Sequence, residues 1–419
     1  IEITSGSDFN PLNVSYQPNA TAAIPSNIQP MENSKIITNL PNNIATVLSG
    51  QLGNSNNATA TASQVLDLIE TSLSNNGSSL RYPKAFYLAL RENMLSHIVS
   101  SSDVFNARLG NNTVEHVYFT NESDVNSEPH PFMVIACHAA SSRPNLLLDV
   151  NRPPGAQPGV GYGQSTVTRN GKLGEFLIKI PLKDYGLIST LLDNDLTQYG
   201  DLASDFDNSQ GSTTTKDVFN YTSLSSIGVA VDGVTIYPAL NNTLNFAVEA
   251  AEVTSSGIHV GGGLELHYHA DGHAFNGNGI NLYNLSDFTG NNHPPAIGIS
   301  YDGIALFGKY EDSFSSMEGY GIALDDFGGH DHGDGFGYHY HAHTKTITSS
   351  MNPNTTFDEH ILLVGAWKGD INSIPGFLEV KDNQLMDNDI GPYAGSVSGI
   401  VLATDDFKVQ NSIKLFPNP

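Results

Sequence analysis

Residues Gly321–Thr344, GIALDDFGGHDHGDGFGYHYHAHT, place five histidines within fourteen residues, beside four aspartates. The histidines are His330, His332, His339, His341 and His343, and the aspartates are Asp325, Asp326, Asp331 and Asp334. If Phe336–His341 is a strand, its aromatic residues lie on one face and His339 and His341 on the other, because successive side chains alternate. Imidazoles gathered beside carboxylates favour a transition metal ion. The stretch therefore predicts a metal or ligand site on a β scaffold.

An earlier part of the chain repeats this motif. Residues 264–270, LELHYHA, align with residues 336–342, FGYHYHA, and each histidine falls on a histidine. Further upstream, residues 227–237, IGVAVDGVTIY, align with residues 297–307, IGISYDGIALF. The offset between the copies is 72 residues for the first pair and 70 for the second. We interpret this pattern as an internal duplication.

Each copy is expected to be an antiparallel β unit. Asp232-Gly233 and Asp302-Gly303 separate alternating runs, and glycine supplies the positive φ that a tight hairpin turn demands. We interpret Asp232 and Asp302 as turn-forming rather than catalytic residues. Two such units would pair about a pseudo-twofold axis, which would bring the two His-Tyr-His faces together.

The predicted metal ligands come from both copies, and either copper or zinc suits histidine ligands. They are His267, His269, His330, His332, His339 and His341. An aspartate could complete the shell, and a catalytic site would keep one coordination position open for water. Tyr338 and Tyr340 are expected on the core face, away from the metal. In the alternative interpretation the histidines belong to a polar loop and bond only carboxylates and backbone carbonyls.

The sequence names no reaction and no catalytic residue. It contains no nucleophile elbow, no phosphate-binding loop and no dinucleotide fingerprint. Two classes of function therefore stay open. One is a metal-binding protein or metalloenzyme, and the other is a structural or interaction subunit of an extracellular assembly.

Four short motifs resemble the YHYH-domain family of secreted bacterial proteins, over roughly residues 220–375. They are Tyr338-His339-Tyr340-His341, Gly329-His330, the segment HPPAIG at residues 293–298, and Asp302-Gly303. In the first copy Leu266 stands where the motif has tyrosine, so only the second copy is complete. The resemblance implies a fold unit and a secreted setting, and it supplies no reaction.

The C-terminal residues Leu415–Pro419, LFPNP, resemble the opening of the sorting domain used by type IX secretion in Bacteroidetes. This resemblance implies a protein that is released outside the cell or displayed on its surface. The chain opens at Ile1 without a leader, which we interpret as a mature form. The alternative interpretation of the C-terminus is a proline-rich tail.

The composition of the chain limits the classes of partner that it is expected to bind. Acidic residues outnumber basic ones by 43 to 18, which gives a formal net charge of −25. Nucleic acids and anionic membranes attract basic surfaces, so neither is an expected partner. The acidic run at residues 195–217 favours a solvated loop, and calcium binding there is the alternative interpretation. No run of 18 apolar residues exists, so we expect no membrane span.

We expect a mainly β protein, α+β overall, with a small helical subdomain near the N-terminus. Residues 1–60 predict an extended Asn/Ser/Thr-rich arm, through which copies could associate. Residues 61–219 predict two helices, one from Ser63 to the Asn75-Asn76-Gly77 stop and one from Pro83 to about Ser100, followed by strands that include the apolar run ending at Cys137. Residues 220–405 form the duplicated YHYH-like β domain, and residues 406–419 a linker and the start of a sorting signal.

Overall fold

The computed structural model describes most of the chain between Ala62 and Ala394. The described residues are 62–97, 113–123, 128–137, 141, 148–150, 165–168, 176–189, 226–241, 246, 253, 257–260, 266–272, 282–283, 295–309, 321–349, 353–374, 377, 386–387 and 393–394. The predicted N-terminal arm (1–60), the acidic stretch (195–217) and the sorting tail (406–419) lie outside them.

Two helices open the described chain, as the periodicity predicts. Helix α2 (Ala62–Asn75) buries residues at helical spacing and is followed by Gly77 at φ 72°, a conformation that glycine adopts without steric cost. Helix α3 (Lys84–Ser96) follows Pro83, which stands at the N-cap, one position before the predicted one. The buried residues of α2 are Ala62, Val65, Leu66, Ile69 and Leu73.

A five-stranded antiparallel sheet packs beside these helices, in the order β1-β2-β5-β17-β16. Its strands are β1 (Val114–Ser123), β2 (Pro129–Cys137), β5 (Phe176–Pro181), β16 (Met386–Asp387) and β17 (Tyr393–Ala394). The predicted strand ending at Cys137 is confirmed as β2, and Cys137 is buried. Two further strands, β3 (Leu148–Val150) and β4 (Ser165–Thr168), pair with each other.

The duplicated region forms an eight-stranded sheet whose order is β12-β13-β11-β10-β6-β7-β9-β8. The first copy supplies β6 (Gly228–Ala230), β7 (Thr235–Ile236), β8 (Ile258–Val260) and β9 (Leu266–Tyr268). The second copy supplies β10 (Gly298–Ser300), β11 (Ala305–Phe307), β12 (Gly329–His330) and β13 (His339–His341). The order is symmetric about the antiparallel β6–β10 pair, so the duplication in the sequence is a duplication in the sheet.

Each copy is a mixed unit rather than a purely antiparallel one. The predicted Asp-Gly hairpins are present as β6–β7 and β10–β11, with Gly233 at φ 80° and Gly303 at φ 82°. The His-Tyr-His strand of each copy then joins its hairpin in parallel, β9 on β7 and β13 on β11. This direction is possible because a long connection precedes each His-Tyr-His strand, and parallel pairing needs such a crossover.

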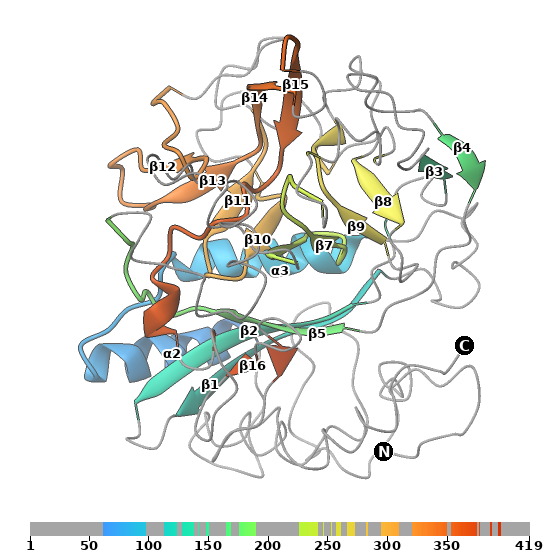
Figure 1. Ribbon diagram of the computed structural model, residues 1–419. Coiled ribbons are helices and arrows are strands. Elements are labelled where there is room, and N and C mark those ends of the chain that lie inside the picture. Colours follow the sequence, from blue (N-terminus) through green and yellow to red (C-terminus); the bar gives the residue numbers. More distant parts are fainter. Residues whose placement is uncertain are drawn as a thin grey trace, which may run out of the picture.

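Helix α3 lies between the two sheets (Figure 1). It contacts β1 on one side, and Asn93 donates a 3.1 Å hydrogen bond to the carbonyl of Ala296, just before β10, on the other. Phe86 places its ring 6.4 Å from that of Phe307 in β11. The buried apolar side chains of the helices and both sheets form one core.

The hairpin of β14 (His343–Thr348) and β15 (Thr356–Ile361) continues from β13, and the short helix η7 (Ile371–Ser373) follows.

Candidate metal centre

Four imidazoles converge at the β12–β13 edge of the eight-stranded sheet. One ring nitrogen from each of His330, His332, His339 and His341 lies within 4.8 Å of the other three. His330 ends β12 and pairs directly with His339 of β13, while His332 follows β12 by two residues. Among the described residues this is the one histidine, cysteine or carboxylate group close enough to hold a metal ion. Four of the six predicted ligands therefore meet.

Backbone carbonyls orient three of these rings. The Nδ1 atom of His330 hydrogen-bonds to the carbonyl oxygen of Ile322 at 2.6 Å. That of His339 bonds to the carbonyl of Gly337 at 2.8 Å, and that of His341 to the carbonyl of Gly308 at 2.6 Å. A carbonyl only accepts, so each Nδ1 carries the proton, and each Nε2 keeps its lone pair. All four Nε2 atoms of the cluster are buried. An oriented neutral imidazole whose outer nitrogen donates to a carbonyl is the usual form of a histidine metal ligand.

The ring packing shows how compact the cluster is. The His330 ring centroid lies 4.4 Å from that of His332 and 4.9 Å from those of both His339 and His341. In a tetrahedral zinc site with Zn–N of about 2.0–2.1 Å, ligand nitrogens lie roughly 3.3–3.4 Å apart. Nitrogens that lie up to 4.8 Å apart would have to move closer together to reach that spacing.

The surroundings of His339 are apolar, and burial keeps His341 neutral. Phe307 and Phe336 place their ring centroids 5.3 Å and 5.5 Å from that of His339. Burial, reinforced by His339, His330 and His332, holds the pKa of His341 well below its usual range. A deprotonated imidazole is the form that a metal requires, so this ligand is ready to bind at neutral pH.

The aspartates of the same stretch shape the loop rather than joining the cluster. Asp331 and Asp334 are exposed, and their carboxylates accept the backbone N–H groups of Gly333 (2.7 Å) and Phe336 (2.9 Å). Asp325 accepts the hydroxyl of Tyr338 at 2.8 Å. None of these three aspartates therefore supplies the carboxylate that was predicted to complete the metal shell. Their carboxylates hydrogen-bond within the loop instead.

Glycines set where the histidine strand begins. The alternation predicts a strand from Phe336, but β13 begins at His339, because Gly337 takes φ 101° and breaks the extended run. At Gly329, an added Cβ would lie 2.4 Å from the carbonyl oxygen of His339 and 2.5 Å from the hydroxyl of Tyr338. Only glycine lets β12 approach β13 this closely, and that approach brings His330 to His339.

The tyrosines of the motif face the core, as predicted, and they also anchor the strand. Tyr340 donates a 2.8 Å hydrogen bond to the buried carboxylate of Asp302, and Tyr268 makes the same bond to Asp232 in the first copy. Each aspartate also accepts a backbone N–H in its own turn, from Ile304 at 3.2 Å in the second copy. The turn-forming prediction is right but incomplete, since these aspartates also fix the His-Tyr-His strands. In both copies Asp-Gly is followed by Tyr, 36 residues after the aspartate in the first copy and 38 in the second, and this recurrence is the sequence signal for the bond.

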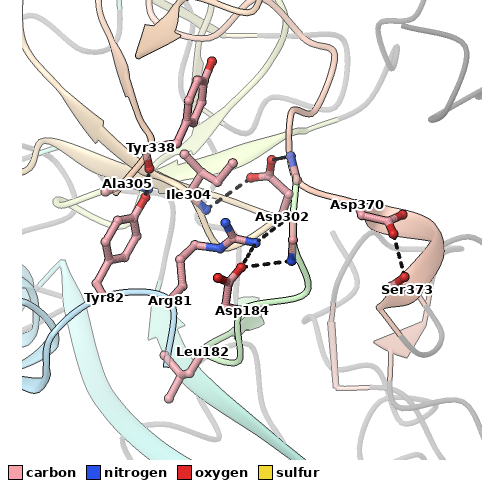
Figure 2. A network of polar contacts seen from close by, with 12 residues as sticks. Arg81, Tyr82, Leu182, Asp184, Asp302, Ile304, Ala305, Tyr338, Asp370 and Ser373 are labelled. Carbon is pink, nitrogen blue, oxygen red and sulfur yellow. Dashed lines mark hydrogen bonds and ion pairs between the residues drawn. The ribbon is translucent and has the colours of Figure 1, made fainter. Parts of the chain in front are cut away.

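Tyr82, just before α3, is a residue that the sequence did not single out. Its hydroxyl donates to the carbonyl of Tyr338 at 2.5 Å and accepts the N–H of Ala305 at 3.0 Å, as Figure 2 shows. Its ring also stacks on Phe336 at 4.8 Å. The helical subdomain thereby fixes the segment that leads into β13.

His267 and His269 lie elsewhere, which corrects the expectation that the two pairs meet at the pseudo-twofold axis. Strands β6 and β10 occupy that axis, and β9 and β13 are separated from each other by five strand spacings. At about 4.8 Å for each spacing, the path from one strand to the other along the sheet is roughly 24 Å. The reason is topological: each His-Tyr-His strand adds to the outer side of its own hairpin.

No family model, curated protein or solved structure matches this chain. Within the described part, neither helix is long and apolar enough to span a membrane.

Proposed function

We propose that this protein binds a first-row transition metal ion, copper(II) or zinc(II), through His330, His332, His339 and His341. The observation that carries the proposal is the convergence of four ring nitrogens within 4.8 Å, with three of the rings oriented by backbone carbonyls. Neutral imidazole nitrogen is a preferred donor for both metals.

The four-histidine donor set favours a structural metal site over a catalytic one. Four protein ligands complete the tetrahedral shell that zinc adopts in structural sites, whereas catalytic zinc keeps three ligands and a water. Three of the four imidazoles are buried, and His332 is half-buried. We propose that the metal pins β12 to β13 and so stabilises the edge of the sheet.

The direct test is the metal content of the full chain. Purified wild-type protein should contain copper or zinc, and the His339→Ala/His341→Ala variant should contain one equivalent less. His97→Gln is the matched control, because His97 is half-buried at the end of α3 and bonds Asn93 instead. His332→Gln, at the least buried ligand, guards against misfolding: it should weaken metal binding while the circular dichroism spectrum stays unchanged. Equal metal content in wild type and the double variant would refute the proposal.

We also propose an extracellular setting. The resemblance to secreted YHYH-domain proteins, the C-terminal motif LFPNP and the net charge of −25 support it. In such a setting, a closed metal centre would suit a subunit of a surface assembly, the second function class. Association through the arm, residues 1–60, and calcium binding at residues 195–217 stay predictions, because both segments lie outside the described residues.

A further inference from the structure

The four histidines of the proposed metal centre are held in two different ways. His330, His339 and His341 stand on the paired strands β12 and β13, with exposed fractions of 5%, 0% and 1%. The Nδ1 atom of each is bonded to a backbone carbonyl. His332 is half-buried and lies in a loop, two residues after β12 ends. The sheet therefore fixes three ligands, and a loop carries the fourth.

Short-range bonds shape the loop that carries His332, residues 331–335. Asp331 accepts the N–H of Gly333 at 2.7 Å, and Asp334 accepts the N–H two positions further on at 2.9 Å. Because each bond joins residues two positions apart, neither ties the loop to a sheet. Gly333 has a φ of 71°, and a Cβ added there would meet no atom of the described residues within 4 Å. The loop therefore has room to move without disturbing the packed core.

Both ends of this loop are anchored. Before it, His330 pairs with His339 across the two strands. After it, the ring of Phe336 lies 4.8 Å from that of Tyr82 and 5.8 Å from that of Phe307. A movement of the loop would thus leave the three strand ligands in place. A bound metal ion would still join β12 to β13 while His332 is away from it.

The ring of His332 lies on the solvent side of the cluster. It stacks on His339 with centroids 5.1 Å apart and planes at 20°, and its centroid is 4.4 Å from that of His330. Because the other three ligands are buried, the approach from solvent passes this ring. Asp331 and Asp334 flank it and are exposed. Exposed carboxylates beside the entrance of a site speed the capture of cations.

We infer that the metal ion enters and leaves the four-histidine centre past the loop 331–335, with His332 as the displaceable ligand and Asp331 and Asp334 as the groups that attract the incoming cation. The inference rests on the proposed metal site and adds how that site is loaded. While His332 is displaced, the three strand histidines hold the ion and one coordination position is open. The centre therefore exchanges a divalent first-row metal ion with its surroundings.

Cobalt(II) uptake by the metal-free full chain, followed by the d–d absorption of the bound ion, tests the role of His332. His332→Gln should still bind one equivalent, because three ligands remain. It should take up cobalt faster than wild type, because the ring that stands in the way is gone. Release into excess EDTA should be at least about tenfold faster, since loss of even an outer-shell partner weakens a metal site by about 10–100-fold.

The variant Asp331→Asn/Asp334→Asn tests the attraction of the cation. Asparagine keeps a side-chain oxygen that accepts the backbone N–H, so the turns stay while both charges are removed. Uptake at low salt should slow by roughly tenfold, and the difference should shrink at high salt because exposed charges are screened. The matched control is Asp358→Asn/Asp370→Asn, which removes the same charge from two aspartates that also accept hydrogen bonds, at 2.7 Å and 3.1 Å.

The outcomes separate this inference from the proposed function. If wild type takes up no cobalt, the metal centre itself is overturned, and the inference with it. If wild type binds one equivalent but His332→Gln binds none, or takes it up no faster, His332 is not the displaceable ligand. If Asp331→Asn/Asp334→Asn and its control take up cobalt at the same rate, the ion does not enter past this loop.

Discussion

The hydroxyl of Tyr340 lies 2.8 Å from the Oδ2 atom of Asp302, although the two residues are 38 positions apart in the sequence. Both side chains are buried, and the bond ties the His-Tyr-His strand to the hairpin turn beside it. Burial and the Asp302 carboxylate raise the pKa of Tyr340, so the phenol stays protonated and continues to donate. Because Tyr340 lies between His339 and His341, this bond also sets the position of two proposed ligands.

We predict that Tyr340→Phe destabilises the protein by about 1–3 kcal/mol, because a buried carboxylate loses a donor. Asp302 keeps the N–H groups of Ile304 and Gly369, so the fold should survive. Urea unfolding measures the change, and metal affinity should fall as well. Tyr268→Phe is the matched control: it should cost a similar amount of stability but leave the four-histidine centre intact. Unchanged affinity in Tyr340→Phe would mean that the bond does not position the ligands.

Gly329→Ala should disrupt the metal centre by sterics alone. The added Cβ would lie 2.4 Å from the carbonyl oxygen of His339, so β12 must move away from β13 and take His330 with it. Overpacking of this kind typically costs about 1–3 kcal/mol. We expect weaker metal binding, measured by competition with a chromogenic chelator. Gly333→Asn is the control, because the space around Gly333 is open and asparagine tolerates its φ of 71°. Equal affinity in all three proteins would contradict the prediction.

The stability of the metal-free protein should fall as the pH drops below about 6.5, the pKa of histidine in an unfolded chain. Burial keeps the pKa of His341 well below that value in the folded state. Between the two pKa values, the unfolded state therefore binds more protons than the folded state. In this pH window the free energy of unfolding falls by up to about 1.4 kcal/mol for each pH unit because of this one group. The loss is complete once the pH has fallen through the folded pKa.

Urea unfolding of the chelator-treated protein at pH 7.5 and at pH 5.5 measures this dependence. His341→Gln removes the group and should make the dependence shallower, whereas His97→Gln should leave it as in wild type. Identical slopes in wild type and His341→Gln would rule out His341 as the source.

Lys309→Met should be strongly destabilising. Lys309 is buried, donates to Thr344 at 3.1 Å and lies 3.9 Å from the buried carboxylate of Asp271. Removing one partner of a buried pair typically costs about 3–5 kcal/mol, because the other charge stays behind. The control is Lys84→Met, which removes an exposed ion pair with Asp67 and should cost no more than about 1 kcal/mol.

Thermal unfolding of the two lysine variants provides the comparison. Lys309 follows β11 in the second copy, and Asp271 follows β9 in the first, so the pair joins the two copies. A loss for Lys309→Met no larger than that for Lys84→Met would show that the buried pair contributes little.

The sequence by itself determined the local elements and the duplication. Helical periodicity with Gly77 and Pro83 located α2 and α3, Asp-Gly located both hairpins, and the His-x-His spacing paired the histidines within each strand. These signals are short-range, because turn chemistry and side-chain alternation act over a few residues. They also sufficed to place His339 and His341 on one side of β13.

Tertiary structure alone decided which histidines meet. The order of the strands brings His330 and His332 to the second pair and separates His267 and His269 from it. The bond of Tyr82 to Tyr338 was equally hidden, because it joins distant parts of the chain. The physical reason is that strand order depends on the edge of each hairpin to which the His-Tyr-His strand is added after its long connection. That choice rests on packing of the whole core, and no local pattern encodes it.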